Sequence, residues 1–356
     1  MKYWAILCVG VWILGCQSSE SEKEKGNTYQ LNTTIHYAEK FKVDSNQVVV
    51  TKPWPGAVKP KKYAVNSVPE RIIVTSTTHL PYLELLNLVD RLVGFPNTQY
   101  INSKQIRKHV ESGAITDLGP DGNLNIELVL SLRPDAVFAF DMGSESTSLD
   151  KLAEAGIPVI YNADYLETSA LGRAEWIKFF GAFFHKENEA DSIFNQIATV
   201  YDSLKTLTSE VDQRPRILSG VLYGDIWYLP GGQNWASGFF QDAGADYLWA
   251  NDPTSGWLEL SFESVFDKAR NADFWIGTST FNTKEELKGQ DARYEDFKAF
   301  EEHQVYNYSK RLNAYGSYDF FESGYARPDL VLADMIKILH PELLPNYTTY
   351  YYERLP

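Results

Sequence analysis

The chain has 356 residues, a formal net charge of −14 at pH 7 and a pI near 4.9, and 44% of its residues are hydrophobic. An acidic chain is poorly suited to bind the phosphates of a nucleic acid, so we expect no nucleic-acid partner. Its two cysteines are Cys8 and Cys16. This excludes disulfides, thiolate metal sites and cysteine nucleophiles from the rest of the chain, which is long enough for two lobes with separate cores.

The first sixteen residues have the pattern of an export signal. Lys2 precedes a short apolar run that is too short for a permanent membrane span, and no later stretch is long enough to be one. The run ends in Ile13-Leu14-Gly15-Cys16, which resembles the bacterial lipobox. We therefore expect residues 1–15 to be a lipoprotein signal peptide, Cys16 to be the lipidation site, and a lipid membrane to hold the protein through Cys16.

Residues 16–34 and 35–66 form two further predicted segments. The first begins with a polar and charged stretch that contains no large apolar residue, so we predict a flexible tether. Its acidic character loosely resembles tracts that send some lipoproteins to the cell surface. We expect a lipid-anchored, periplasm-facing protein, with surface exposure as the alternative. Prolines interrupt the short extended pieces of residues 35–66, which predicts an N-terminal extended ribbon.

From Pro69 onward, short apolar strands alternate with helices, which is the pattern of parallel β/α units. We assign these units to an N-terminal α/β lobe over residues 67–168. The expected strands span residues 71–75, 91–95, 135–140 and 157–161. The expected helices span residues 81–88, 101–110, 125–132 and 148–155.

The sequence of residues 169–211 predicts a linking helical region with a break near His185. In its second half one apolar helical face is expected, formed by Ile193, Ile197, Val200, Leu204 and Leu207. Residues 212–356 follow as a C-terminal α/β lobe. Its expected strands span residues 216–223, 273–277 and 305–308, and its expected helices span residues 238–243, 261–269 and 329–339. The fold class is therefore α/β, with a long helix between two sets of β/α units.

One sequence pattern occurs on both sides of the helical middle. Asn125-Ile126-Glu127 precedes Arg133-Pro134-Asp135, and Ser261-Phe262-Glu263 precedes Arg270-Asn271-Ala272-Asp273. Each copy has a polar helix cap, a glutamate in the first turn, an arginine, an aspartate and then a strand, which indicates two similar lobes. A glutamate in the first turn also stabilises the helix dipole by roughly 0.3–1 kcal/mol, so both glutamates have a structural explanation as well.

A set of short motifs occurs in a characteristic order from Pro69 to Leu344. The motifs are Pro69-Glu70-Arg71-Ile72, Asp117-Leu118-Gly119, Asn125-x-Glu127, Leu132-Arg133-Pro134-Asp135, Ala155-Gly156-Ile157-Pro158-Val159 and Ser261-x-Glu263. Their order and spacing resemble the iron-siderophore and vitamin B12 class (class III, helical-backbone) of periplasmic substrate-binding proteins. The resemblance implies two Rossmann-like lobes with parallel sheets, joined by a long rigid helix, with a ligand in the interlobe cleft.

The same resemblance implies a function in ABC transport. The ligand would be an iron-siderophore-type ferric chelate, with cobalamin or haem as the alternative. No intrinsic cofactor is expected. The partners would be a permease dimer and its cytoplasmic ATPase, and Glu127 and Glu263 would dock on permease arginines.

Ligands of α/β sheets approach the carboxyl ends of the strands, so the loops that follow the strands are the expected contacts. Aromatic faces there suit a large chelate, although some of them could pack in the core instead. The candidates are His79, Tyr100, Trp227, Tyr228 and Phe281. Trp257 and Asp319 match ligand contacts of the B12-binding member. Two positions differ from that member: Ser323 stands where it has an arginine, and Asp121 stands where it has a pocket tryptophan. These differences favour a siderophore or haem over cobalamin.

His79 directly follows the first strand of the N-terminal lobe. Related binders of bare zinc or manganese have a histidine in such a place, so a direct metal-ion site that uses His79 is a further alternative. The other histidines form no close pair, and a structural role for His79 is the competing interpretation. No nucleophile elbow, phosphate loop, zinc-protease motif or dinucleotide fingerprint is present in the sequence. We therefore expect no catalytic residue and no enzymatic activity.

Overall fold

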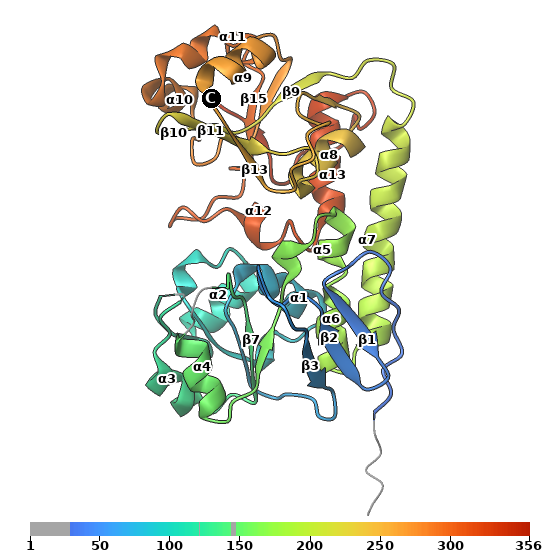
Figure 1. Ribbon diagram of the computed structural model, residues 1–356, viewed down its shortest axis with the longest axis vertical. Coiled ribbons are helices and arrows are strands. Elements are labelled where there is room, and N and C mark those ends of the chain that lie inside the picture. Colours follow the sequence, from blue (N-terminus) through green and yellow to red (C-terminus); the bar gives the residue numbers. More distant parts are fainter. Residues whose placement is uncertain (1–28, 121, 144–146) are drawn as a thin grey trace, which may run out of the picture.

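The computed structural model describes residues 29–120, 122–143 and 147–356. Two α/β lobes lie one above the other along the longest axis, and helix α7 (Glu187–Thr208) runs beside them (Figure 1). This confirms the predicted fold class. Cys16, the signal peptide and Asp121 lie outside the described residues. Within the described ranges, no helix has both the length and the apolar character that a membrane crossing needs.

The N-terminal lobe contains a parallel sheet in the order β6-β5-β4-β7-β8. Its strands are β4 (Ile72–Val74), β5 (Leu92–Phe95), β6 (Thr116–Asp117), β7 (Ala136–Ala139) and β8 (Val159–Tyr161). The helices are α1 (Leu80–Leu85), α2 (Lys104–Glu111), α3 (Ile126–Leu132) and α4 (Thr147–Glu154), with 3-10 turns η1 (Thr77–His79), η2 (Val89–Arg91), η3 (Thr98–Tyr100) and η4 (Asp164–Leu166). Strands β4, β5 and β7 are buried throughout, as expected for a parallel sheet that is covered on both faces.

The predicted ribbon is an antiparallel sheet of β1 (Phe41–Asp44), β2 (Gln47–Val50) and β3 (Lys61–Ala64). The segment before it differs from the prediction. The Tyr29 ring stacks on His185 with centroids 3.4 Å apart, and the Thr33 hydroxyl donates to Asp191 at 2.7 Å. A tether that extends to residue 34 is therefore wrong, because residues 29–34 already contact the folded protein.

The helical middle consists of α5 (Ala170–Ala174), α6 (Ile177–Phe183) and α7. The predicted break is confirmed at His185, whose φ of 53° places it in the left-handed region. Val200 and Leu207 were expected on the buried face of α7, but both are exposed. The larger rings of Phe194 and Tyr201 are buried instead, so the face of α7 that carries them packs against the rest of the protein.

The C-terminal lobe has a second five-stranded sheet, in the order β12-β9-β14-β15-β16, which is parallel except for its last pair. Its strands are β9 (Arg216–Leu218), β12 (Asp246–Tyr247), β14 (Phe274–Ile276), β15 (Val305–Asn307) and β16 (Glu353–Arg354). The helices are α8 (Trp235–Asp242), α9 (Phe262–Ala269), α10 (Lys284–Gln290), α11 (Lys298–Glu301), α12 (Asp319–Glu322) and α13 (Pro328–Leu339), with the 3-10 turn η5 (Ala292–Asp296).

A further antiparallel sheet in this lobe was not predicted. It consists of β10 (Val221–Tyr223), β11 (Ile226–Pro230) and β13 (Trp257–Leu260), in that order. The single strand expected over residues 216–223 is divided between β9 and β10 at Gly220, which has a φ of 77°. A side chain at Gly220 would overlap the carbonyl oxygen of Tyr228, so glycine is required at this turn.

Candidate functional site

A cavity of about 670 Å³ lies in the C-terminal lobe. One wall comes from the β10–β11–β13 sheet, and the others come from α8, the loop after β14 and the segment that follows β15. All of its lining residues lie between Ser219 and Tyr352. The resemblance implied a ligand cleft between the lobes. This cavity differs from that expectation, because no described residue of the N-terminal lobe lines it.

Stacked rings form the floor of the cavity. Phe320 lies parallel to Tyr308, with centroids 4.8 Å apart, and it stacks more loosely on Trp235 at 6.0 Å. At the mouth, Tyr223 is 81% exposed and Trp257 is 59% exposed. The cavity therefore combines a packed aromatic floor with free aromatic faces at its entrance, an arrangement that suits a large organic ligand.

The lining is polar in places but uncharged. Among the described residues no Asp, Glu, Lys, Arg or His lines the cavity, whose non-aromatic polar side chains are those of Ser219, Ser279, Thr280 and Gln290. Burial raises the pKa of Tyr308 and of Tyr352 well above 10. Both phenols are therefore neutral at physiological pH.

Residues 309–327, which we call the crossing segment, connect the cavity with the N-terminal lobe. Its helix α12 lies between the two lobes in Figure 1. Phe320 and Phe321 line the cavity, whereas the Glu322 carboxylate accepts hydrogen bonds from the backbone N–H groups of Asn102 and Ser103, at 2.6 and 2.8 Å. These donors lie at the amino end of α2. One short segment thus contacts the cavity and the opposite lobe at the same time.

The Glu322 side chain is a buried carboxylate. Burial is the largest effect on this side chain, and it raises the pKa of Glu322 to about 8, although the two backbone donors act in the opposite direction. Two side-chain contacts lie beside it: the Asn102 amide donates to the Ser317 hydroxyl at 3.0 Å, and the Asn313 amide donates to the Gln99 carbonyl at 3.1 Å.

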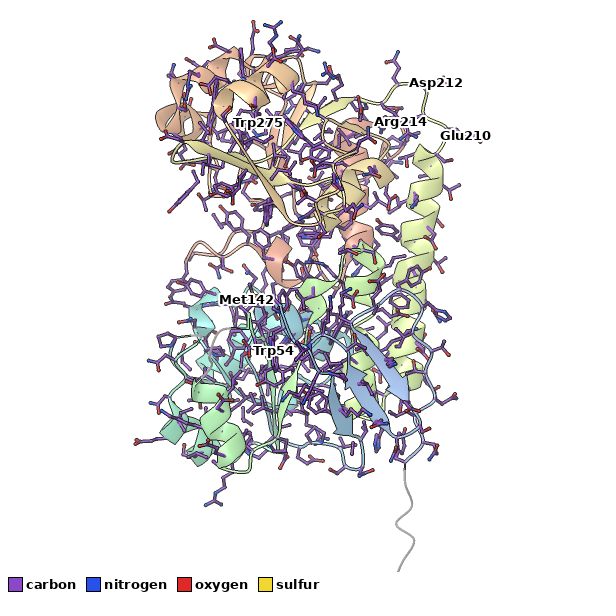
Figure 2. The ribbon with its side chains drawn as sticks, viewed as in Figure 1. Trp54, Met142, Glu210, Asp212, Arg214 and Trp275 are labelled. Atoms are coloured by element: carbon purple, nitrogen blue, oxygen red, sulfur yellow. The ribbon has the colours of Figure 1, made fainter. Side chains whose placement is uncertain are left out.

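Three predicted contacts, Tyr228, Trp257 and Phe281, line the cavity. Trp227 does not. It is 0% exposed, its indole N–H donates to the Ser219 carbonyl at 3.0 Å, and its ring lies 5.5 Å from that of Trp275. Trp275 lies inside the C-terminal lobe in Figure 2. Because successive side chains of a strand point to opposite faces, β11 directs Tyr228 to the cavity and Trp227 to the core.

The two predicted contacts of the N-terminal lobe lie outside the cavity. Tyr100 is at the surface, and His79 is 0% exposed beside the ring of Phe180. Neither ring nitrogen of His79 has a hydrogen-bond partner in the part of the chain that the structure describes. Burial lowers the pKa of His79 to about 3, so the imidazole is neutral. No group of three or more His, Cys, Asp or Glu side chains that could hold a metal ion occurs within the described ranges.

Asp319 also lies outside the cavity lining. Its carboxylate accepts hydrogen bonds from the Arg311 guanidinium and from the Ser323 hydroxyl, the latter at 2.8 Å. The Arg311 guanidinium in turn lies 4.3 Å from the centroid of the Tyr350 ring. Asp319 therefore holds the crossing segment together internally, and Ser323, one of the departures from the B12-binding pattern, is its partner.

Glu127 and Glu263 occupy equivalent positions in the two lobes. Each is the second residue of its helix, and the caps Asn125 and Ser261 accept hydrogen bonds from the backbone of the first turn. Glu127 is exposed, and the Glu263 side chain is 76% exposed, with Arg293 at 3.4 Å. Both carboxylates are accessible to a partner, and they lie on separate lobes, as the docking prediction requires.

Several residues that line the cavity were not among the predicted contacts. Among them are Tyr223, Phe239, Phe321 and Tyr352, and the floor residue Tyr308. One usable signal was present: Tyr223-Gly224-Asp225 is a turn motif between two aromatic segments and it indicates a hairpin.

Comparisons with known proteins agree with this architecture. A family model described as "Periplasmic binding protein" matches residues 72–312. An uncharacterized lipoprotein of Methanocaldococcus jannaschii is 26% identical over 313 residues, which cover 84% of this chain and 73% of the relative. An uncharacterized ABC transporter substrate-binding lipoprotein of Bacillus subtilis is 25% identical and covers 85% of this chain and 87% of the relative.

A solved structure has the same fold. It is described as an ABC-type Fe3+-hydroxamate transport system from Saccharomonospora viridis, and it superposes with a TM-score of 0.60 over 82% of this chain and 98% of that one. At 16% identity, the likeness shows a shared fold.

Proposed function

Because the chain belongs to the periplasmic binding protein family and is a substrate-binding component of an ABC transporter, we propose that it captures an iron-siderophore-type chelate and delivers it to a permease dimer powered by a cytoplasmic ATPase. The observation that carries this proposal is the aromatic cavity of about 670 Å³. Its volume lies within the roughly 300–1,000 Å³ that small-molecule sites occupy.

The residues that line the cavity favour a metal ion enclosed in an organic chelator over a bare metal ion. A bare ion needs several converging oxygen, nitrogen or sulfur ligands, whereas this cavity offers mainly ring faces. In a chelate, the organic ligand already satisfies the metal, so the protein contacts only the outer surface of the complex. Tyr228, Trp257 and Phe281 are the proposed contacts to that surface.

Cobalamin and haem are the alternative ligands. Trp257 lines the cavity and supports cobalamin, because a pocket tryptophan occupies the matching position of the B12-binding member. Asp319 matched that member as well, but Arg311 and Ser323 bind its carboxylate outside the cavity lining. Of these two cobalamin-like positions, one remains in the proposed site, which weakens this alternative.

Delivery would use the two exposed glutamates. A single exposed ion pair contributes only roughly 0–1 kcal/mol. Two pairs at a fixed separation, Glu127 on one lobe and Glu263 on the other, set the orientation of the complex and still allow release. We further propose that lipidation at Cys16 holds the protein at the membrane of the cell envelope, where the permease is located.

Tryptophan fluorescence offers a direct test, since Trp235 and Trp257 line the cavity. The full-length mature protein would be titrated with a neutral ferric trihydroxamate, a ferric tris-catecholate, haemin and cobalamin. Saturable quenching by a ferric chelate supports the proposal. Quenching by haemin or cobalamin alone supports the alternative ligand, and an unchanged emission with all four probes contradicts binding of this ligand class.

A further inference from the structure

Three arginines that are close to lining residues in the chain or stack on one contact other groups, although the Nη1 atom of Arg173 has no hydrogen-bond partner among the described residues. Arg311 binds Asp319, and Arg293 binds Asp291 at 2.7 Å. The Arg173 guanidinium lies between two rings, 4.3 Å from the centroid of Trp235 and 4.3 Å from that of Tyr325. None of these three arginines is a lining residue.

An anionic ligand would therefore enter this cavity without a counter-charge. Its water shell would be lost, and a buried charge that gains no partner is strongly disfavoured. Aromatic faces add to the cost, since the face of a ring carries negative potential and attracts cations. The chain's net charge of −14 also disfavours the approach of an anion.

Ferric chelates divide clearly by charge. Three hydroxamate groups, each with one negative charge, neutralise Fe³⁺, whereas three doubly charged catecholates give a trianion. On the basis of the function proposed above, we propose that this cavity selects ferric chelates with an uncharged outer shell, of the trihydroxamate class, and rejects tris-catecholate trianions.

The rim of the cavity offers a position at which this selectivity can be changed. Gln290 is the last residue of α10, it is exposed, and it is the only amide side chain among the described residues that line the cavity. A lysine at this position would supply the missing cation at the mouth without filling the aromatic floor. Gln241 provides the matched control, because it is also an exposed helical glutamine but lies on α8 outside the lining.

The test compares the affinities of the two ferric chelates for the wild type, Gln290→Lys and Gln241→Lys, at several salt concentrations. For the wild type we expect the neutral trihydroxamate to bind at least about 100-fold more tightly than the trianion, as expected for an unpaired buried charge, with little dependence on salt. Gln290→Lys should improve the affinity for the trianion about 5- to 10-fold at low salt. Gln241→Lys should not improve it.

Three results would decide against the inference. Equal or tighter binding of the trianion by the wild type would overturn the selectivity, while the proposed capture of chelates would stand. An equal gain in both lysine variants would show an effect of net charge alone, and would overturn the role of the cavity. If neither chelate bound to a protein that still unfolds cooperatively, both the inference and the proposed function would be wrong.

Discussion

The two lobes use the carboxyl ends of their strands in different ways. In the N-terminal lobe, this region buries ionisable side chains: burial lowers the pKa of His79 to about 3 and raises that of Asp164 to about 6. In the C-terminal lobe, the corresponding region is an open cavity whose lining, among the described residues, is largely aromatic and carries no charged side chain. The outer helices with Glu127 and Glu263 nevertheless match closely. The lobes thus share the position of a first-turn glutamate, whereas the C-terminal one carries the cavity of the proposed ligand site.

The largest expected effect is on stability, and it concerns a residue of the C-terminal lobe that lies in the core and not in the cavity. Trp227→Ala removes a fully buried ring that contacts Trp275, Tyr294 and Phe297. We expect a loss of about 3–5 kcal/mol in the free energy of unfolding, because a large cavity remains. Denaturant unfolding followed by circular dichroism measures this loss. A loss below about 1 kcal/mol would place Trp227 outside the core.

The N-terminal lobe should respond to acid through His79. Its folded-state pKa of about 3 lies below the usual 6.5, so the unfolded chain binds the proton first and stability falls as the pH drops below 6.5. Below pH 6.5, each pH unit lowers the free energy of unfolding by about 1.4 kcal/mol, which amounts to nearly 3 kcal/mol at pH 4.5.

The measurement is the unfolding free energy of the wild type and of His79→Leu between pH 7 and pH 4.5. Asp164 has a raised pKa and acts in the opposite direction below pH 6, so the difference between the two proteins isolates His79. Parallel curves would show that His79 is not buried in its neutral form. Ligand affinity should stay nearly constant over this range, because no charged side chain lines the described cavity.

A smaller effect is expected at the cavity mouth. Trp257→Ala removes a ring that is 59% exposed, so stability should change by less than about 1 kcal/mol. The affinity for the ferric trihydroxamate should fall about 10-fold, which corresponds to the loss of one aromatic contact. Calorimetric titration gives the affinity and thermal unfolding gives the stability. An unchanged affinity would remove Trp257 from the site.

The smallest effect on binding is expected at the two glutamates that we propose for docking. Glu127→Ala combined with Glu263→Ala should leave ligand affinity unchanged, since neither residue lines the cavity. Uptake of the radiolabelled chelate by cells should nevertheless fall, because both proposed permease contacts are lost. Normal uptake by the double variant would contradict the docking assignment.

The parallel sheets could be predicted because their strands are short, apolar and fully buried. Ile72–Val74 and Ala136–Ala139 have this character, and the sequence pattern indicates them directly. The β10–β11–β13 sheet was not indicated by such a pattern of short, apolar and buried strands. Tyr223 and Trp257 lie in its strands with exposed rings, and the turn at Gly220 interrupts an apolar run that otherwise predicts one strand.

The site could be predicted only in part. Tyr228 and Trp227 are adjacent aromatic residues that the sequence treats alike, and only the packing of β11 decides which ring faces the cavity. The crossing segment had no local signal either. Its contact through Glu322 joins residues that are about 220 positions apart, and such pairing depends on the arrangement of the lobes.

The position of the bound iron tests the central claim most directly. Crystals grown with a neutral ferric trihydroxamate would be measured near the iron absorption edge, so that the anomalous signal locates the metal. We expect the iron inside the C-terminal lobe, within the cavity that Tyr228, Trp257 and Phe281 line. An iron position between the lobes, beside Tyr100 and on the other side of the crossing segment, would contradict this account.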